Sequence, residues 1–225
     1  MVLGLPFRKQ RSRLPSGPEL YRRLIGEHAP GRTFLDVGCM WGVNGGYAFH
    51  ALESGASRVV GLDVEAATAQ FLEENRRRGE RVEFVQGDVT DPCTPDRLGR
   101  FDVVFCAGVL YHVPDPLLTL GHLRRMCGHV LILASPVFPE QMVGQSAVFL
   151  PGLDETSRRR LTYPSPHVKR GLDSEFDAEK GYGNWFWAFS PSCLRAMVET
   201  AGFAIVDFHH WGRLGCAVGG PRAAT

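Results

Sequence analysis

The sequence has no CxxC pair, no hydrophobic run long enough to span a membrane and no excess of charge of either sign. Its six cysteines are scattered, which favours reduced thiols in a cytoplasmic protein and predicts no metal site. The net charge of +1 predicts no general attraction to nucleic acid or to membranes. A short apolar start followed by the basic tract RKQRSR is the reverse of a secretory signal. These absences are typical of an ordinary globular protein.

Short apolar runs alternate along the chain with stretches of helical periodicity. The runs are rich in Val, Ile, Leu and Phe without strict alternation, which is typical of strands covered on both faces. They span residues 33–38, 58–63, 81–88, 101–108 and 129–135. Helices are expected near 18–28 and over 43–53, 65–78 and 114–126. The alternation predicts a parallel sheet with helices on both faces and a ligand site at the C-terminal edge of its strands.

The regular pattern stops after Ser135 and resumes at Ser190. Residues 136–189 have no clear period and are rich in proline, glycine, charged and aromatic residues. Connections this long are either disordered or functional, and the aromatic content argues against disorder. Ser190 then predicts a helix start, and two strands with a turn near 211–212 follow. We therefore expect one domain over 1–225, with a basic segment and helix in 1–30 and a substrate lid in 136–189.

Acidic residues or glycines follow each of the first four predicted strands. Asp63 stands one helix and one strand after Asp36, where a carboxylate can accept hydrogen bonds from both hydroxyls of a ribose. Asp88, after the third strand, can accept from an adenine amino group, and glycines let the backbone approach a ligand closely. Each acid by itself is better explained as a turn residue. As an ordered set, they predict a nucleoside-containing cofactor.

The segments that carry these residues resemble the motifs of the class I S-adenosylmethionine-dependent methyltransferases. They are LDVGC with Gly42, GLDVE, GDV and FDVVFCAGVLYHVPDP. The resemblance is specific over 33–135 and vaguer over 190–220, and GVLYHVPDP with LESGASRVVGLD is similar to one bacterial subgroup. That subgroup includes small-molecule methyltransferases and enzymes that carboxymethylate the wobble uridine of tRNA. The resemblance implies an α/β, Rossmann-like fold: a seven-stranded, mostly parallel sheet with helices on both faces and an antiparallel last strand.

The resemblance also implies S-adenosylmethionine as the cofactor. Asp36 would reach its amino group and Asp63 its ribose, while Asp88 would bind the amino group of the adenine. The other implied positions flank the methionine part, sandwich the adenine or hold the ammonium. In full, the implied cofactor-binding residues are Asp36, Gly38, Cys39, Gly42, Asp63, Val64, Asp88, Val89, Ala107 and Gly108. Met40 departs from the family pattern, which usually has a glycine there, and we expect Met40 and Trp41 to shape the methionine end of the pocket or to shield the sulfonium.

Histidines and aromatic residues are the candidates for contact with the acceptor. His112 follows the fourth strand at the ligand edge and is the leading general base, although it can equally cap the next helix or orient the loop. His209 and His210 are further base candidates if the last turn falls at the same edge; the alternative is a surface turn. Acceptor contacts are expected from Tyr111, Tyr163, His167, Trp185, Trp187 and Trp211. Such aromatic residues either line a pocket for a ring or dock the insertion onto the sheet.

The sequence favours a methyltransferase that acts on a small, ring-containing acceptor. O-methylation in bacterial secondary or sugar metabolism best fits the size, the aromatic insertion and the balanced charge. The first alternative is a tRNA-modifying alkyltransferase for the wobble uridine, which would need a broad basic face. The second is a non-catalytic S-adenosylmethionine-binding module, which the departure at Met40 suggests. The acceptor, the methylated atom and the oligomeric state stay open at this point.

Overall fold

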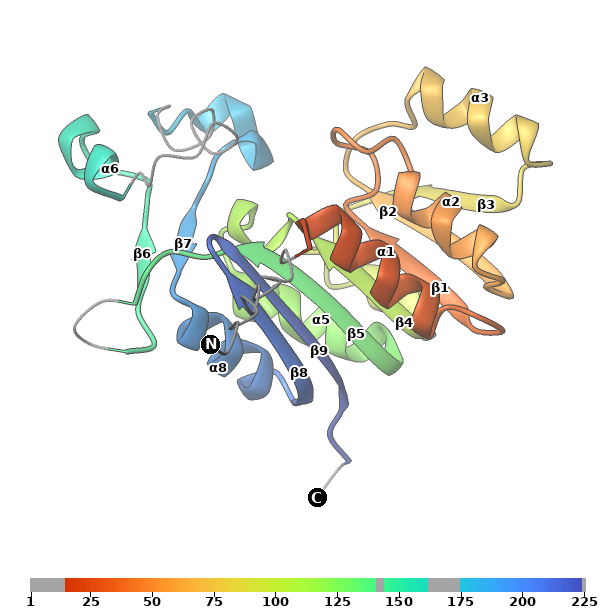
Figure 1. Ribbon diagram of the computed structural model, residues 1–225. Helices are drawn as coiled ribbons and strands as arrows, with labels where there is room; N and C mark the ends of the chain where they lie inside the picture. The colour runs from red at the N-terminus through yellow and green to blue at the C-terminus, as the bar shows by residue number, and fades with distance from the viewer. Residues whose placement is uncertain (1–14, 141–143, 162–174, 224–225) are drawn as a thin grey trace, which may run out of the picture.

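The computed structural model describes residues 15–140, 144–161 and 175–223. A seven-stranded sheet with the order β3-β2-β1-β4-β5-β9-β8 forms its centre (Figure 1). The strands are β1 (Thr33–Val37), β2 (Arg58–Asp63), β3 (Val82–Gln86), β4 (Phe101–Ala107), β5 (Cys127–Pro136), β8 (Phe203–Trp211) and β9 (Leu214–Pro221). Strands β1 to β5 are parallel, and β9 runs antiparallel to both of its neighbours, β5 and β8. The predicted fold class is confirmed.

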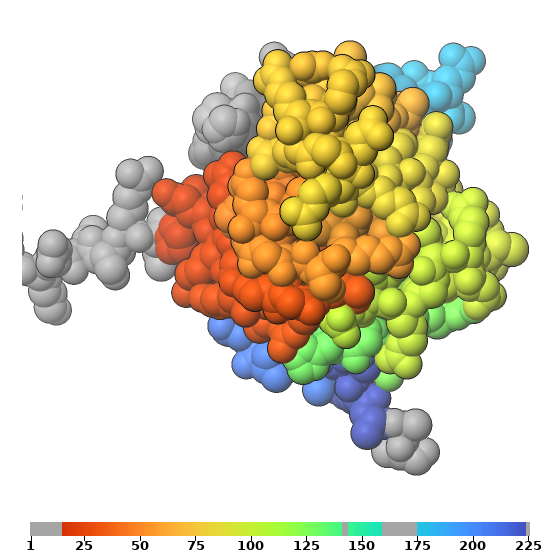
Figure 2. All heavy atoms as spheres, turned by 90° about the vertical axis from the view of Figure 1, so that its right-hand side faces the viewer, coloured from red at the N-terminus to blue at the C-terminus, as the bar shows by residue number. Residues whose placement is uncertain are grey.

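Helices cover both faces of this sheet. They are α1 (Gly17–His28), α2 (Gly46–Glu53) and α3 (Ala69–Arg77) on one face, and α5 (Pro116–Met126) and α8 (Pro191–Thr200) on the other. Within β1, Phe34 packs with the first group and Leu35 with the second. Successive side chains of a strand point to opposite faces, so a strand between two helical layers is apolar throughout. Figure 2 shows α1, α2 and α3 as one surface that runs from red to yellow.

Some helices begin later than the sequence pattern predicts. Helix α2 begins at Gly46 because Asn44 and Gly45, with φ of 47° and 76°, lie in the left-handed region and hold the chain in a turn. Helix α3 begins at Ala69, where the Thr68 side chain caps it by accepting from the N–H of Phe71. The cap predicted at Ser190 is confirmed, since its hydroxyl accepts from the N–H of Cys193. A short helix, α4 (Thr94–Leu98), joins β3 to β4 and has no counterpart among the predictions.

The insertion contains short elements of its own. Strand β6 (Ala147–Phe149) pairs antiparallel with β7 (Trp187–Phe189) in a second, two-stranded sheet. Helix α6 (Glu155–Leu161) and the 3₁₀ helix η2 (Ala178–Gly183) lie between them in the sequence. Figure 1 places these elements beyond the end of β5, at the C-terminal edge of the main sheet. Strands of three residues are too short for a periodic signal, which is why the sequence predicts only an aromatic connection here.

Three further findings concern the described residues as a whole. No described helix combines the length and the apolar character needed to cross a membrane. All six cysteines are free thiols, and only Cys93 is exposed. Among the described side chains, no group of three or more His, Cys, Asp or Glu is placed to hold a metal ion.

Candidate cofactor and acceptor site

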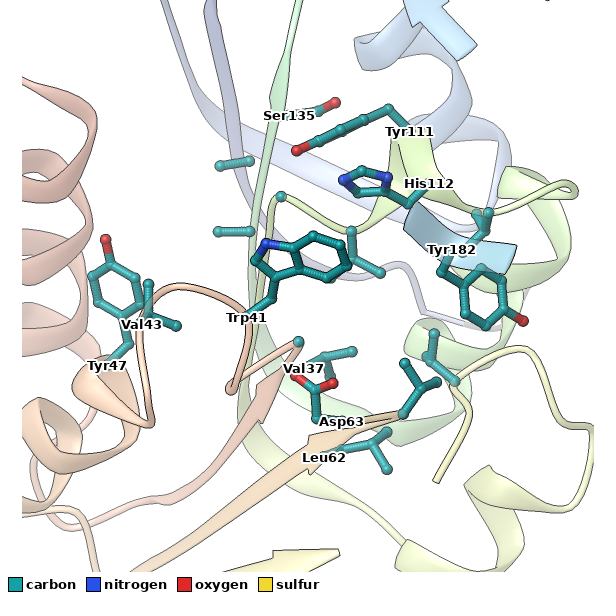
Figure 3. A pocket seen from close by; sticks show the side chains of 18 of the residues that line it. Val37, Trp41, Val43, Tyr47, Leu62, Asp63, Tyr111, His112, Ser135 and Tyr182 are labelled. Carbon is teal, nitrogen blue, oxygen red and sulfur yellow. The ribbon is translucent and has the colours of Figure 1, made fainter. Parts of the chain in front are cut away.

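A pocket of about 500 Å³ opens at the C-terminal edge of the parallel strands (Figure 3). This volume lies in the range of ordinary ligand pockets, roughly 300–1,000 Å³. Its wall comes from the ends of β1 to β5, from α1 and α2, from the β8–β9 turn and from η2 of the insertion. Nine residues that the sequence predicts for the site line it: Gly38, Asp63, Val64, Asp88, Val89, Ala107, Gly108, Tyr111 and His112. The C-terminal ends of the strands therefore meet in one cavity, as parallel strands require.

The loop after β1 separates the roles of Met40 and Trp41. The Met40 side chain is 1% exposed and packs in the core with α1 and α2, so it does not enter the pocket. Its backbone N–H donates to Asp63 Oδ2 over 2.7 Å and ties the loop to the end of β2. Trp41 is 67% exposed and lines the pocket. Gly38, with φ of 81°, allows the tight turn, and a Cβ there would collide with Val109.

Two carboxylates face the pocket from neighbouring strands. Asp63, at the end of β2, is 6% exposed, and its second oxygen, Oδ1, accepts from the N–H of Glu65 over 2.9 Å. Asp88 Oδ1 accepts from both the N–H and the hydroxyl of Thr90, at 2.7 and 2.8 Å. Asp88 Oδ2 accepts from the Tyr182 hydroxyl over 2.5 Å. Each carboxylate oxygen can accept two hydrogen bonds, so both side chains keep the capacity to bind a further donor.

Asp36, Cys39 and Gly42 lie outside the wall of the pocket as the described residues form it. Asp36 is 1% exposed, and its Oδ2 has no hydrogen-bond partner among the described residues. Burial raises the pKa of this carboxyl to about 7, against the opposing effect of the Ala48 N–H and with a smaller contribution from the Asp63 charge. Cys39 is fully buried and packs against Gly61, where a side chain would clash with its sulfur. These predicted cofactor contacts stay predictions.

The imidazole of His112 is held in one tautomer. His112 lies in the 3₁₀ helix η1 (Leu110–His112), and its Nδ1 is 2.7 Å from the carbonyl oxygen of Asn184. A carbonyl only accepts, so Nδ1 carries the proton and Nε2 keeps its lone pair. Burial lowers the pKa of His112, and the Asn184 carbonyl partly offsets this. The neighbouring helix α5 is capped by Asp115, whose side chain accepts from the N–H of Leu118. His112 is therefore not the cap of that helix.

Aromatic rings surround His112 on two sides. Its ring lies nearly parallel to that of Trp41, with centroids 6.2 Å apart and an angle of 17°. Tyr111 lies on the other side, with centroids 4.1 Å apart. Figure 3 shows the rings of Tyr111, His112 and Trp41 following one another across the pocket, with Asp63 beyond Trp41. This end of the cavity is thus aromatic, and the carboxylates lie at the other.

The tryptophans of the insertion contact the loop after β4 from outside the pocket. The Trp185 ring packs on Tyr111, with centroids 4.2 Å apart, and does not line the pocket. Trp187 donates from Nε1 to the carbonyl of Pro114 over 3.0 Å and packs against Phe149. Both contacts match the docking alternative, in which aromatic residues attach the insertion to the sheet. Tyr163 and His167 lie outside the described residues.

The turn between β8 and β9 falls at the pocket edge, but with other residues than predicted. Arg213 and Leu214 line the pocket, whereas His209, His210 and Trp211 do not. His209 Nε2 lies 3.0 Å from Asp207 Oδ2 within β8, and His210 is exposed. The Arg213 guanidinium lies over the ring of Phe138, 5.2 Å from its centroid. The prediction that His209, His210 and Trp211 face the pocket is therefore wrong, because within this hairpin only residues after Gly212 line the cavity.

Several residues of the pocket wall are not predicted from the sequence, because their helices and the insertion carry no pattern that marks a ligand site. Tyr21 lies on α1, which the sequence marks only as an amphipathic helix, and Tyr47 lies at the start of α2. Tyr182 belongs to the insertion, where no pattern places a residue against the end of β3. The sequence did carry a signal for two of the missed residues. Ser135 ends the predicted strand 129–135, and Arg213 follows the predicted turn near 211–212.

Comparison with known proteins identifies the class of this pocket. Residues 35–129, which carry the strand ends and loops described above, match the family described as "Methyltransferase domain". Residues 35–129 therefore form a methyltransferase domain of the class I S-adenosylmethionine-dependent type. The resemblance seen in the sequence is thereby confirmed, and S-adenosylmethionine is the cofactor of this family. The match runs from within β1 to the start of β5, so Asp63, Asp88 and His112 lie within it.

Relatives of this methyltransferase domain have different acceptors. The tRNA U34 carboxymethyltransferase of Campylobacter lari is 33% identical over 96 residues, which are 42% of this chain and 31% of that protein. The ubiquinone biosynthesis O-methyltransferase of Vibrio campbellii is 32% identical over 108 residues, which are 44% of this chain and 42% of that protein. The matched part of the chain spans about a third of the length of the tRNA-modifying relatives.

A solved structure extends the likeness to nearly the whole chain. The 1,6-didemethyltoxoflavin-N1-methyltransferase of Burkholderia thailandensis, with bound 1,6-didemethyltoxoflavin and S-adenosylhomocysteine, has a TM-score of 0.59 and 18% identity. The likeness covers 90% of this chain and 79% of that chain. It shows that the fold of the methyltransferase domain, including the strands after the insertion, is shared.

Proposed function

We propose that this protein transfers a methyl group from S-adenosylmethionine to a hydroxyl group of a small, ring-containing molecule. One observation carries the proposal: a single pocket joins two carboxylates at its cofactor end to a neutral histidine with a free Nε2 at its aromatic end. The first feature suits a nucleoside, and the second suits an acceptor that must lose a proton. We place the reaction in bacterial secondary or sugar metabolism.

The residues present fit this cofactor. Asp63 and Asp88 would accept from the ribose hydroxyls and from the adenine amino group, and both have acceptor capacity left. Val64 and Val89, which line the pocket beside them, would hold the faces of the adenine. The unpartnered Oδ2 of Asp36 lies next to the loop that would hold the methionine part. When bound, S-adenosylmethionine supplies an electrophilic methyl group on its sulfonium sulfur.

The aromatic end would hold the acceptor and take its proton. Trp41 and Tyr111 line the pocket on either side of His112 and would contact a ring of the acceptor. Aromatic contacts of this kind contribute about 0.5–1.5 kcal/mol beyond area burial. Since the Asn184 carbonyl keeps the proton on Nδ1, His112 Nε2 would accept the proton of an acceptor hydroxyl. The insertion over 136–189 would act as the lid of this end, because Asn184 contacts His112 and Trp185 packs on Tyr111.

Two measurements test the proposal in order. Calorimetry should show binding of S-adenosylmethionine or S-adenosylhomocysteine at micromolar concentration, and no heat at millimolar ligand would refute it. Incubation with methyl-labelled cofactor and bacterial metabolite extract should then label a small molecule, whose identification gives the acceptor and the methylated atom. Binding without turnover of any acceptor would instead favour a non-catalytic cofactor-binding module.

The tRNA U34 carboxymethyltransferases among the relatives support one alternative, a tRNA-modifying alkyltransferase. Against it stands the net charge of +1, since tRNA binding depends on many contacts between cations and phosphates. Gel-shift experiments at low salt decide between the two. A tRNA complex that dissociates steeply with added salt would favour the alternative, and the absence of any complex would exclude it.

A further inference from the structure

One short stretch of the insertion, residues 182–186, contacts both ends of the pocket. At the cofactor end, the Tyr182 hydroxyl donates to Asp88 Oδ2 over 2.5 Å and lies 2.9 Å from the hydroxyl oxygen of Thr90. At the acceptor end, the Asn184 carbonyl accepts from His112 Nδ1 over 2.7 Å. The ends of β3 and β4 are thus joined by a segment that is distant from both in the sequence.

The link between Tyr182 and Asn184 is a closed loop. The Asn184 side chain is 4% exposed, and its amide donates to the carbonyls of Asp177 and Gly181, at 2.6 and 2.9 Å. Its Oδ1 accepts from the N–H of Asp177 over 3.0 Å. Both N–H groups and the oxygen of the Asn184 side-chain amide are thus hydrogen-bonded within the loop, which holds the loop from 177 to 184 in one shape. A displacement of Tyr182 therefore moves the Asn184 carbonyl as well.

Further contacts fasten the same stretch to the acceptor side. The N–H of Phe186 donates to the carbonyl of Tyr111 over 2.9 Å. The Trp185 ring packs on Tyr111 and stands edge-on to His112, with centroids 4.2 and 5.9 Å away. At the cofactor end, the Tyr182 ring packs against the core and its hydroxyl is the tether to Asp88. The hydrogen bond to Asp88 therefore fixes where this end of the loop lies.

We propose that Tyr182 is a positioning residue for His112, which it orients through Asn184. With Tyr182 on Asp88, the Asn184 carbonyl stays at Nδ1 and Nε2 of His112 keeps its lone pair for the acceptor. This inference rests on the proposed function, in which Asp88 binds the adenine of the cofactor. Oδ2 of Asp88 can accept a second donor, so the adenine amino group and Tyr182 would meet on one atom. Filling of the cofactor end would then stabilise the orientation of the base.

The test uses the tautomer of His112, which a merely structural role of Tyr182 would not change. In the full chain labelled with ¹⁵N-histidine, long-range proton–nitrogen spectra show which ring nitrogen carries the proton. Loss of its signals in His112→Gln assigns this residue among the eight histidines. The wild-type protein should show the Nδ1–H form. Tyr182→Phe, which removes one oxygen and keeps the ring, should give a mixture with the Nε2–H form.

A matched control and a second variant make the result decisive. Lys180→Ala disturbs the same 3₁₀ helix at an exposed ion pair with Asp177 and should leave the tautomer unchanged. Asn184→Asp, which removes both amide donations, should act like Tyr182→Phe. An unchanged tautomer in Tyr182→Phe would overturn the proposal, and so would an equal change in Lys180→Ala, which would indicate general loosening of the insertion.

Binding of S-adenosylhomocysteine gives the second readout. Calorimetry on Tyr182→Phe should show a dissociation constant raised about fivefold to tenfold, because Asp88 loses one hydrogen bond that orients it, whereas Lys180→Ala should match the wild type. The tautomer measurement needs no ligand, so the two hypotheses fail separately. A wild-type protein that does not bind the ligand would refute the proposed function and leave the tautomer result standing. Normal binding with the same affinity and tautomer in Tyr182→Phe would refute only the role of Tyr182.

Discussion

The backbone N–H of Met40 donates to the buried carboxylate of Asp63 over 2.7 Å, so one side chain shapes the loop after β1 and faces the cofactor end of the pocket. Asp63→Ala should therefore lower both stability and cofactor affinity. Loss of a partner for a buried N–H costs about 1–3 kcal/mol. Each hydrogen bond to a charged group contributes about 1.5–3 kcal/mol, so loss of the ribose contacts predicts affinity lower by roughly a hundredfold. Urea unfolding and calorimetry measure the two effects.

The matched control for Asp63→Ala is Glu65→Ala. Glu65 is exposed beside the same loop, and it contacts Asp63 through its backbone N–H, which the substitution keeps. Both quantities should stay within error of the wild type. An Asp63→Ala protein that binds S-adenosylhomocysteine normally would show that this carboxylate serves the loop alone.

Met40 and Trp41 should respond in opposite ways to truncation. Met40→Ala removes a side chain that is 1% exposed in the core and should cost about 2–5 kcal/mol of unfolding free energy. Trp41→Ala removes an exposed pocket residue and should leave stability within about 0.5 kcal/mol, while it weakens acceptor binding. Thermal unfolding and acceptor KM separate the two. A Met40→Ala protein with unchanged stability and altered acceptor choice would show that the Met40 side chain acts in the pocket.

The sequence predicts the framework of this site because strand ends carry a local signal. Asp63, Asp88 and Gly108 each follow an apolar run that is readable by itself, and parallel strands bring such ends to one edge. The same logic extends to His112, which lies in η1, the short helix after β4. It fails for Met40, whose side chain could face the pocket or the core, since the direction depends on the φ angles of a turn.

The insertion marks the limit of prediction. Nothing in its sequence places Tyr182 at Asp88 or the Asn184 carbonyl at His112, because both contacts join segments that are far apart along the chain. The predicted role of the aromatic cluster was open between a pocket wall and a docking seam. Trp185 packs behind Tyr111 in the second arrangement. Such choices depend on tertiary packing and have no periodic signal.

His112→Asn should reduce turnover with little effect on cofactor affinity. Loss of a general base typically lowers the rate by about 10²–10⁴. A base works only when unprotonated, and burial lowers the pKa of His112 from its ordinary value of 6.5. The imidazole is therefore neutral at pH 7, and kcat should fall only as the pH drops below 6.5. Once the acceptor is known, pH–rate profiles check this, and a variant that keeps wild-type kcat would exclude His112 as the base.

The Asp36 carboxyl should make the free protein less stable as the pH rises. Burial raises its pKa from 3.8 to about 7 in the folded state, so the folded protein binds this proton more tightly than the unfolded chain. The resulting stability is complete below pH 3.8 and is lost as the pH rises to about 7. The loss is on the order of 4 kcal/mol, at about 1.36 kcal/mol per pKa unit.

Asp36→Asn tests this prediction because it keeps the shape and removes the titration. The variant should show a flatter dependence of unfolding free energy on pH between 4 and 7 than the wild type and higher stability at pH 8. If Asp36 also compensates the ammonium of the cofactor, the same variant should bind S-adenosylhomocysteine more weakly. Urea titrations at several pH values and calorimetry at pH 8 measure both. Greater stability with unchanged affinity would limit Asp36 to a structural role, because a buried carboxylate that contacts the ammonium must lose binding when it becomes an amide.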